Sequence, residues 1–183
     1  MIKLIVLIAL LIPSVALADP PPTDVVTLAS ELEVTFGLKP GTAIAHAEAA
    51  TAAALPGVSA ELLVAVASKE SSFNHRLRGE LVTAAGVPRF CGVLQAMSGG
   101  SPRRCRDLTG IQAGYSAGAA EIEHWLNGRC RGSMDCALRA HGCGNVGVLG
   151  ACAAYPASIW ARVGHLRAGQ RHPERKRREF PSS

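Results

Sequence analysis

The chain has 183 residues, of which 48% are hydrophobic and 18% charged, and its formal net charge is +5. Once an N-terminal targeting segment is set aside, this length suits one domain with its own core. The charge does not indicate a polyanion-binding body, because Lys3 lies in the targeting segment and residues 167–183 hold six Lys or Arg against two Glu. The rest is near neutral, so we expect no nucleic-acid partner.

Residues 1–18 have the pattern of a secretory signal peptide. Lys3 precedes a short apolar run at 4–11, and the small-residue sequence ALA at 16–18 predicts cleavage before Asp19. The run is too short to span a membrane, although an uncleaved N-terminal anchor is the alternative. No Cys follows the ALA sequence, so we expect no lipoprotein anchor. We expect a periplasmic or secreted protein without a membrane span after signal cleavage.

Residues 19–56 predict an N-terminal helical extension. A Pro-rich leader at 19–22 precedes one helix at 23–36, closed by Gly37 and Pro40, and an Ala-rich helix at 42–55. We expect the two helices to pack on the domain that follows at 57–168. The alternative is a loosely ordered spacer, because the Ala-rich helix has few large apolar side chains to bury.

The helix that follows carries the candidate catalytic residue, Glu70. Ser59 is a suitable N-cap, and Leu63, Val66 and Ala67 lie on the same predicted apolar stripe as Glu70. Burial on that stripe and the negative end of the helix dipole both disfavour the ionised carboxylate. A Glu that keeps its proton near neutral pH is a candidate general acid.

The second half predicts an irregular insert followed by three helices. Residues 74–100 are interrupted by glycines and suit loops or a small hairpin. A helix at 113–126 is followed by a short helix that Ser133 caps and that ends near His141. Pro156 suits the first turn of the last helix. The inward-facing residues of that helix are predicted to be Ile159, Trp160 and Val163.

Residues 169–183 are rich in Arg, Lys, Pro and Ser, and we expect them to form a basic disordered tail. The tail could hold an anionic cell-wall polymer, lipid headgroups or nucleic acid, but we interpret it as a solvated, solubilising segment. The fold class expected is therefore all-α, mainly helical, in one domain with a small irregular Gly-rich insert.

Six cysteines lie in the second half of the chain, behind the export signal. Their even number predicts three disulfides in an oxidising compartment. The hypothesis is that sequence neighbours pair: Cys91 with Cys105, Cys130 with Cys136, and Cys143 with Cys152. A zinc site built on Cys130, Cys136, His141 and Cys143 would lack a short pair of closely spaced cysteines. We expect no metal, no cofactor and no Cys nucleophile.

Three short segments resemble the motifs of the soluble lytic transglycosylase family, whose domain has a goose-type lysozyme-like fold. They are ESSFN at 70–74, GVLQA at 92–96 and AHGCG at 140–144, and the resemblance extends over residues 57–167. It implies a lysozyme-like α+β domain. The third segment departs from the family pattern, since His141 stands where the family has the Tyr that hydrogen-bonds the catalytic Glu, and Gly142 stands where Asn is expected.

The resemblance implies cleavage of the β-1,4 bond between N-acetylmuramic acid and N-acetylglucosamine in peptidoglycan. Glu70 would protonate the leaving oxygen and then take the proton of the muramic acid C6 hydroxyl, which closes a 1,6-anhydro ring without water. Ordinary glycosidases use two carboxylates. Residues 86–100 contain no Asp or Glu, which favours transglycosylation. The nearest other carboxylates are those of Glu80, Asp107, Glu121 and Glu123.

Three further residues are implied to bind substrate: Ser71, Gln95 and His141. Ser71 could instead bond its own helix backbone, Gln95 could bond the backbone lining the cleft or be an ordinary loop side chain, and His141 could face solvent. Phe73 is expected in the core. The alternatives to a transglycosylase are a lysozyme-type hydrolase and a non-catalytic peptidoglycan-binding component. Small enzymes of this family often serve secretion or conjugation machines, which the resemblance allows here.

Overall fold

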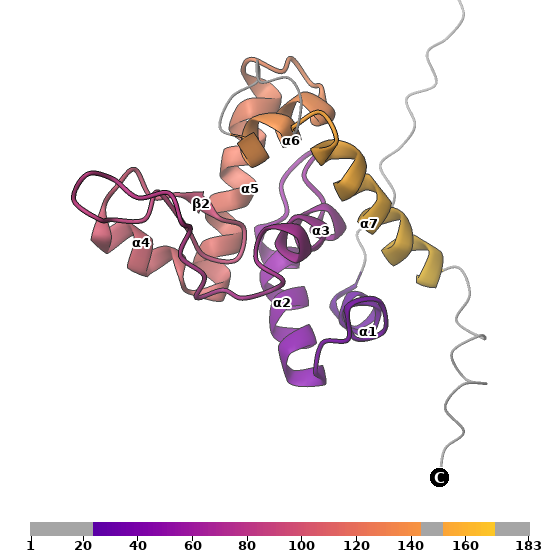
Figure 1. Cartoon of the computed structure of the whole chain (residues 1–183). Helices are drawn as coiled ribbons and strands as arrows, with labels where there is room; N and C mark the ends of the chain where they lie inside the picture. The colour runs from indigo at the N-terminus through magenta and orange to yellow at the C-terminus, as the bar shows by residue number, and fades with distance from the viewer. Residues whose placement is uncertain (1–23, 144–151, 171–183) are drawn as a thin grey trace, which may run out of the picture.

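The structure is a computed structural model that describes residues 24–143 and 152–170 (Figure 1). These residues form seven helices and one two-stranded sheet, so the mainly helical class is confirmed. None of the helices described is long and apolar enough to cross a membrane. The predicted signal peptide, the leader at 19–22 and the basic tail from residue 171 onward lie outside the described residues.

The N-terminal extension consists of α1 (Val25–Phe36) and α2 (Pro40–Ala53). Asp24 caps α1 by accepting a backbone N–H of its first turn, and Gly37 ends the helix with a left-handed φ of 68°. Pro40 was predicted to close the first helix. It instead begins the second, where its missing N–H has no helical partner to lose.

The extension packs on the later helices and shares their core. Helix α2 lies against α5 and α3, and α1 lies against α7. Small side chains on α2, such as Ala43, Ala47 and Ala50, are fully buried together with Leu28 and Leu32 of α1. The Ala-rich face therefore lets the helices approach closely, and the extension is not a loose spacer.

Helix α3 (Ala60–Glu70) lies in the middle of the molecule, with α2, α5 and α7 around it (Figure 1). Ser59 caps it as predicted, with its Oγ 3.3 Å from the Leu62 nitrogen. The expected amphipathic stripe was wrong, because every residue from 62 to 67 is buried. The core surrounds α3 for most of its length, and Glu70 at its end is half-buried.

The Gly-rich insert forms a lobe beside the helical body. Strands β1 (Phe90–Cys91) and β2 (Ala96–Met97) pair antiparallel, as the predicted hairpin, and α4 (Pro102–Leu108) follows. Helix α4 was missed by the sequence analysis. Gly92 packs directly against the end of α4. Only a glycine fits at this position, because a Cβ there would lie 2.1 Å from the Leu108 carbonyl oxygen.

The remaining helices are α5 (Ile111–Asn127), α6 (Met134–Cys143) and α7 (Tyr155–Gln170). Ile159 and Val163 of α7 are buried as predicted. Trp160 was predicted to face inward, which is wrong. Its side chain is 39% exposed, and the indole N–H donates to Asp135 on α6 at 2.6 Å. The predicted disorder from residue 169 also begins too early, since α7 reaches Gln170.

All three neighbour pairings of the cysteines are present. Cys91–Cys105 joins β1 to α4, Cys130–Cys136 joins the end of α5 to α6, and Cys143–Cys152 joins the end of α6 to the start of α7. The three cysteines considered for zinc are therefore all engaged in disulfides. Three disulfides are typical of proteins from an oxidising compartment.

A buried polar pair links the extension to the rest of the core. His46 on α2 places Nδ1 3.1 Å from the Tyr115 hydroxyl on α5, and its ring also packs edge-on against Phe73. Burial, with the nearby His75, lowers the pKa of His46 to about 4 from its ordinary 6.5. The imidazole is therefore neutral in the folded protein at neutral pH.

We expect acid to destabilise the fold through His46. Below pH 6.5 the unfolded chain binds this proton, but the folded protein binds it only below about pH 4. The free energy of unfolding should therefore fall as pH drops through this window, by roughly 3 kcal/mol. Urea unfolding at pH 7 and pH 4.5 measures the loss. In His46→Leu this part of the fall should disappear, and an unchanged fall would assign it to other groups.

Candidate active site

A pocket of about 400 Å³ opens at the C-terminal end of α3, between the hairpin lobe and α6. Three residues that the sequence singled out, Glu70, Gln95 and His141, line it. The remaining lining residues come from the insert and the end of α6: Gly79, Glu80, Leu81, Phe90, Gly142 and Cys143. The pocket thus collects residues from all three motif segments.

The backbone around Glu70 is strained. Ser72 and Phe73, directly after α3, have φ values of 50° and 65°, and Gln95 across the pocket has a φ of 50°. These are three of the four non-Gly residues with positive φ in the described chain. Such conformations cost about 1 kcal/mol or more each and occur often at functional sites. The turn ends α3 abruptly, so that Glu70 is its last residue.

Tyr155, the first residue of α7, holds the Glu70 carboxyl group. Its hydroxyl donates a hydrogen bond to Glu70 Oε1 at 2.5 Å. The ring is buried and lies against Gly142 of α6, where a Cβ would come within 2.6 Å of it. Burial, followed by the charge of Glu70, raises the pKa of Tyr155, so the hydroxyl keeps its proton and remains a donor.

Sequence reasoning missed Tyr155. It placed the partner of Glu70 at position 141, where the family motif has Tyr. One signal was present: the chain has only two tyrosines, and Tyr115 lies on the predicted apolar stripe of its helix. Tyr155 was therefore the remaining tyrosine that could bind Glu70. Gly142 also has a physical explanation here, since a larger residue at this position would displace the Tyr155 ring.

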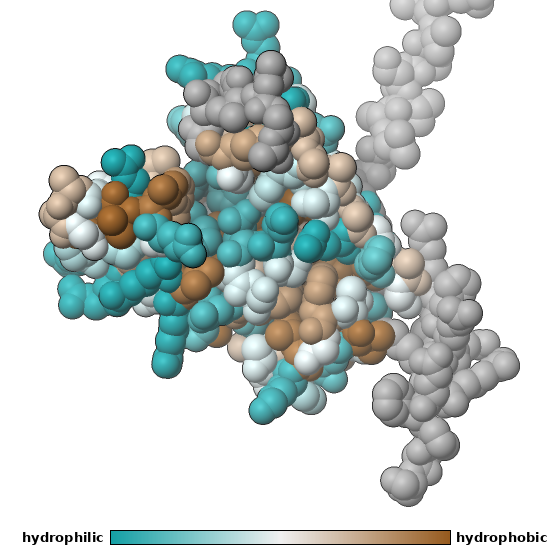
Figure 2. All heavy atoms as spheres, in the orientation of Figure 1, coloured by the Kyte–Doolittle hydropathy of each residue, from teal (hydrophilic) through white to brown (hydrophobic). Residues whose placement is uncertain are grey.

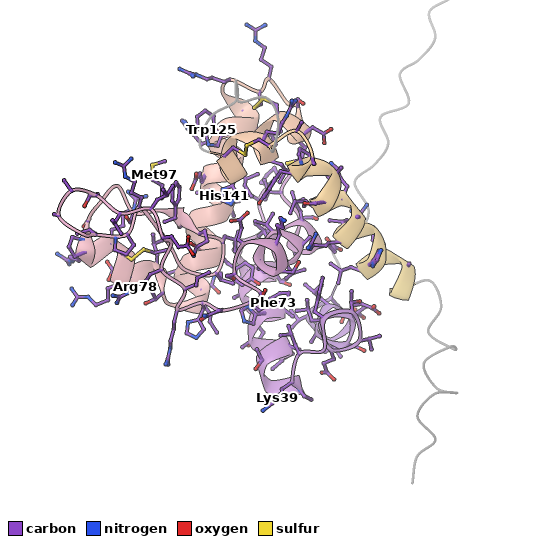
Figure 3. All side chains as sticks on the ribbon, viewed as in Figure 1. Lys39, Phe73, Arg78, Met97, Trp125 and His141 are labelled. Carbon is purple, nitrogen blue, oxygen red and sulfur yellow. A yellow bond between two sulfur atoms is a disulfide. The ribbon has the colours of Figure 1, made fainter. Side chains whose placement is uncertain are left out.

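His141 is buried and holds the hairpin rather than facing solvent (Figure 3). Its Nε2 lies 3.1 Å from the Leu94 carbonyl oxygen and therefore donates to it, while Nδ1 lies 3.7 Å from Glu121 Oε1. Burial alone would lower the pKa of His141, but Glu121 and then Glu70 raise it above its ordinary value. The protonated imidazole is thus favoured, and Nδ1–H points toward Glu121.

Glu121 on α5 completes this arrangement. Its Oε2 accepts the Met97 N–H at 3.3 Å, on the strand that follows Gln95. Burial would raise the pKa of Glu121, but His141, the Met97 N–H and Arg104 lower it below its ordinary value. Glu121 is therefore an ionised partner of His141, and the pair binds the hairpin from the side of α5 and α6.

Ser71, directly after Glu70, also binds this part of the hairpin. Its hydroxyl lies 2.7 Å from the Val93 carbonyl oxygen and 3.2 Å from that of Ala67 in its own helix. The side chain is buried and is not among the residues lining the pocket. The backbone alternative foreseen for Ser71 is thus the geometry observed. Side chains from α3, α5 and α6 together fix residues 93–97.

Gln95 lies within this fixed segment and lines the pocket. Its side-chain amide donates to the carbonyl oxygens of Gly92 at 2.8 Å and Leu77 at 3.3 Å. The amide oxygen lies near Gly79, where a Cβ would be 3.0 Å from it. Gln95 thereby bonds the backbone at Leu77, before the hairpin, and at Gly92, within it, and so connects these two parts of the insert at the pocket wall. This is the backbone-bonding role considered for it.

A second carboxylate is present in the pocket. Glu80 lines it with an exposed side chain. Of the other carboxylates considered from the sequence, Glu121 is engaged with His141, and neither Asp107 nor Glu123 is among the lining residues. Phe73 is buried against Phe36 and His46, as expected for a core residue. Glu70 and Glu80 are therefore the two carboxylates among the residues that line this pocket.

We expect Tyr155→Phe to lower turnover by roughly ten- to a hundredfold, the worth of one hydrogen bond to a charged group. The ring would keep its packing against Gly142, but the Glu70 carboxyl group would lose its fixed orientation. Rates on purified peptidoglycan measure the effect. Tyr115→Phe is the matched control, because it removes a buried hydroxyl that pairs with His46 and is not among the residues lining the pocket, so it should reduce stability without reducing turnover. Equal rates for wild type and Tyr155→Phe would contradict this role.

The chemistry of the pocket is that of one half-buried carboxyl group, held by a neutral phenol, beside walls of mixed polar and apolar side chains. In comparisons with known proteins, no family model matches the sequence, and neither the curated proteins nor the solved structures contain a match. The functional interpretation therefore depends on the motif segments and on the geometry of the site.

Proposed function

We propose that the protein is a peptidoglycan lytic transglycosylase with a lysozyme-like catalytic domain at residues 57–168, acting in the periplasm or outside the cell. It cleaves the β-1,4 bond between N-acetylmuramic acid and N-acetylglucosamine and closes a 1,6-anhydro ring. The observation that supports this most is the hydrogen bond from Tyr155 to Glu70, the carboxyl group that lines the pocket. It supplies the tyrosine partner that the third motif segment lacks.

The mechanism uses the Glu70 carboxyl group twice. Protonated Glu70 donates its proton to the glycosidic oxygen as the bond to the anomeric carbon breaks. The resulting carboxylate, steadied by the Tyr155 hydroxyl, takes the proton of the muramic acid C6 hydroxyl. That oxygen attacks the anomeric carbon of the same sugar, so no positioned water is required. Because Tyr155 keeps its proton, its hydroxyl can donate a hydrogen bond to Glu70 both before and after Glu70 gives up its own proton.

Glu80 supports a second candidate, a lysozyme-type hydrolase. It lies in the same pocket as Glu70, and two carboxylates on either side of a sugar are the arrangement of ordinary glycosidases. Its exposed side chain favours a substrate contact over a buried, held base. The third candidate, a non-catalytic wall-binding component, depended on the poor third motif segment, and the contact between Tyr155 and Glu70 weakens that argument.

Digestion of purified peptidoglycan followed by mass analysis of the products distinguishes the three candidates. Anhydro-muropeptides are the expected result. Products with reducing ends would identify a hydrolase, and the absence of products from folded protein would identify a binding component. The digestion should use the mature protein with its disulfides intact, since Cys143 lines the pocket.

A further inference from the structure

A second pocket, of about 480 Å³, lies on the hairpin lobe and continues from the first. Its walls are formed by Leu81, Thr83, Arg89, Phe90, Met97, Gly99 and Gly100. Leu81 and Phe90 also line the pocket of Glu70. A ligand bound at Glu70 can therefore extend over these two side chains into the second pocket.

The two pockets differ in chemistry. The first contains the carboxylates of Glu70 and Glu80, whereas the lining of the second has no acid and one cation, Arg89. Leu81 and Met97 in its wall are 66% and 44% exposed, so the second pocket offers two adjacent large apolar side chains to a ligand. Figure 2 shows apolar surface among polar atoms on this lobe.

The lobe as a whole is cationic. Residues 74–110 contain six arginines and two acids, while the described helices outside this segment carry most of the acidic residues. All six arginines are exposed: Arg76, Arg78, Arg89, Arg103, Arg104 and Arg106. The near-neutral body is therefore polarised, with its positive end beside the pocket, which favours an anionic ligand group there.

The walls of the second pocket are held by backbone contacts. The Arg89 N–H donates to the Leu81 carbonyl oxygen at 2.8 Å, and the Ser98 N–H donates to the Arg89 carbonyl oxygen at 2.7 Å. Gly100 lies against Thr83, since a Cβ there would be 2.7 Å from Thr83 Cγ2. The position from which the Arg89 side chain projects is thus fixed without any ligand.

We propose that this second pocket binds the peptide stem of the peptidoglycan strand that is cut at Glu70. The stem is attached to muramic acid through a lactyl group, and it carries carboxylates together with small apolar side chains. Arg89 would bind a stem carboxylate, for which a guanidinium is well suited, and Leu81 and Met97 would cover the methyl groups. A glycan stripped of its stems keeps only the lactyl carboxylate beside the sugar and lacks the carboxylates and methyl groups further along the stem. The inference rests on the proposed function for the position of the sugar.

Binding to two soluble tetrasaccharides tests the proposal. They have the same sugars, one with peptide stems and one with the stems removed by an amidase, and calorimetry with the full mature chain measures both affinities. Every protein in this experiment also carries Glu70→Gln to prevent cleavage, and wild type here means no further change. Wild type should bind the stem-bearing form about tenfold more tightly. Arg89→Gln should lose that preference and bind the stripped form as wild type does. Arg103→Gln, which removes an exposed charge on α4 outside this pocket, should keep the preference.

Equal affinities of wild type for the two tetrasaccharides would overturn the proposal, as would equal losses in Arg89→Gln and Arg103→Gln. If neither tetrasaccharide binds, the proposed function fails, and the free stem peptide then decides the second pocket alone. Binding of that peptide to wild type but not to Arg89→Gln supports the inference. No binding of the peptide to either protein overturns it.

Discussion

Glu70→Gln is expected to abolish measurable turnover, with a loss of about 10² to 10⁴-fold or more, because the amide can neither donate the proton to the leaving oxygen nor remove one afterwards. The fold should remain, since Glu70 is the half-buried last residue of α3 and an amide oxygen can still accept from Tyr155. Rates on purified peptidoglycan and a thermal melt of the same sample measure both expectations.

Glu80→Gln is the matched control, because it makes the same chemical change at the other carboxylate of the pocket. In a transglycosylase it should affect turnover far less than Glu70→Gln does. A loss as large as that of Glu70→Gln would support a hydrolase with two carboxylates. Full activity in Glu70→Gln would remove Glu70 from the mechanism.

Reduction of the three disulfides is expected to destabilise the protein strongly. A bridge typically contributes about 2–4 kcal/mol, and the whole domain has about 5–15 kcal/mol of stability to lose. The bridges span 14, 6 and 9 residues, so each contribution should lie toward the lower end of the range. Thermal unfolding followed by circular dichroism, with and without dithiothreitol, should show a much lower melting temperature after reduction.

The individual bridges can be separated by paired Cys→Ser replacements. Loss of Cys143–Cys152 should also reduce activity, because Cys143 lines the pocket and Cys152 lies just before Tyr155. Loss of Cys130–Cys136, at the far turn between α5 and α6, should reduce stability alone. Identical melts before and after reduction would argue against these pairings.

Local signals in the sequence were sufficient for most helices. Caps such as Ser59, and stop signals such as Gly37, act on neighbouring backbone groups and can be recognised without tertiary structure. The disulfides were predictable because each joins cysteines close in sequence. The features that the sequence did not predict correctly depend on tertiary contacts. Helix α4 is short and packs on the hairpin through Cys105, and Trp160 lies outside the core because Asp135 binds its N–H.

The candidate site was only partly predictable for the same reason. Glu70 and Gln95 belong to short motifs, and both line the pocket. The partner of Glu70 is 85 residues away in sequence, and its position depends on how α7 packs against α3. His141 could be placed near the site by its motif, but its role in binding the hairpin with Glu121 depends on the packing of α5 against α6.

The origin of the oxygen at the cleaved anomeric carbon tests the central claim most directly. Peptidoglycan is digested in water labelled with a heavy oxygen isotope, and the muropeptides are analysed by mass. A single Glu70 carboxyl group that activates the sugar's own C6 hydroxyl predicts anhydro products without label. Labelled products with reducing ends would show that water attacked the anomeric carbon, and they would contradict the account.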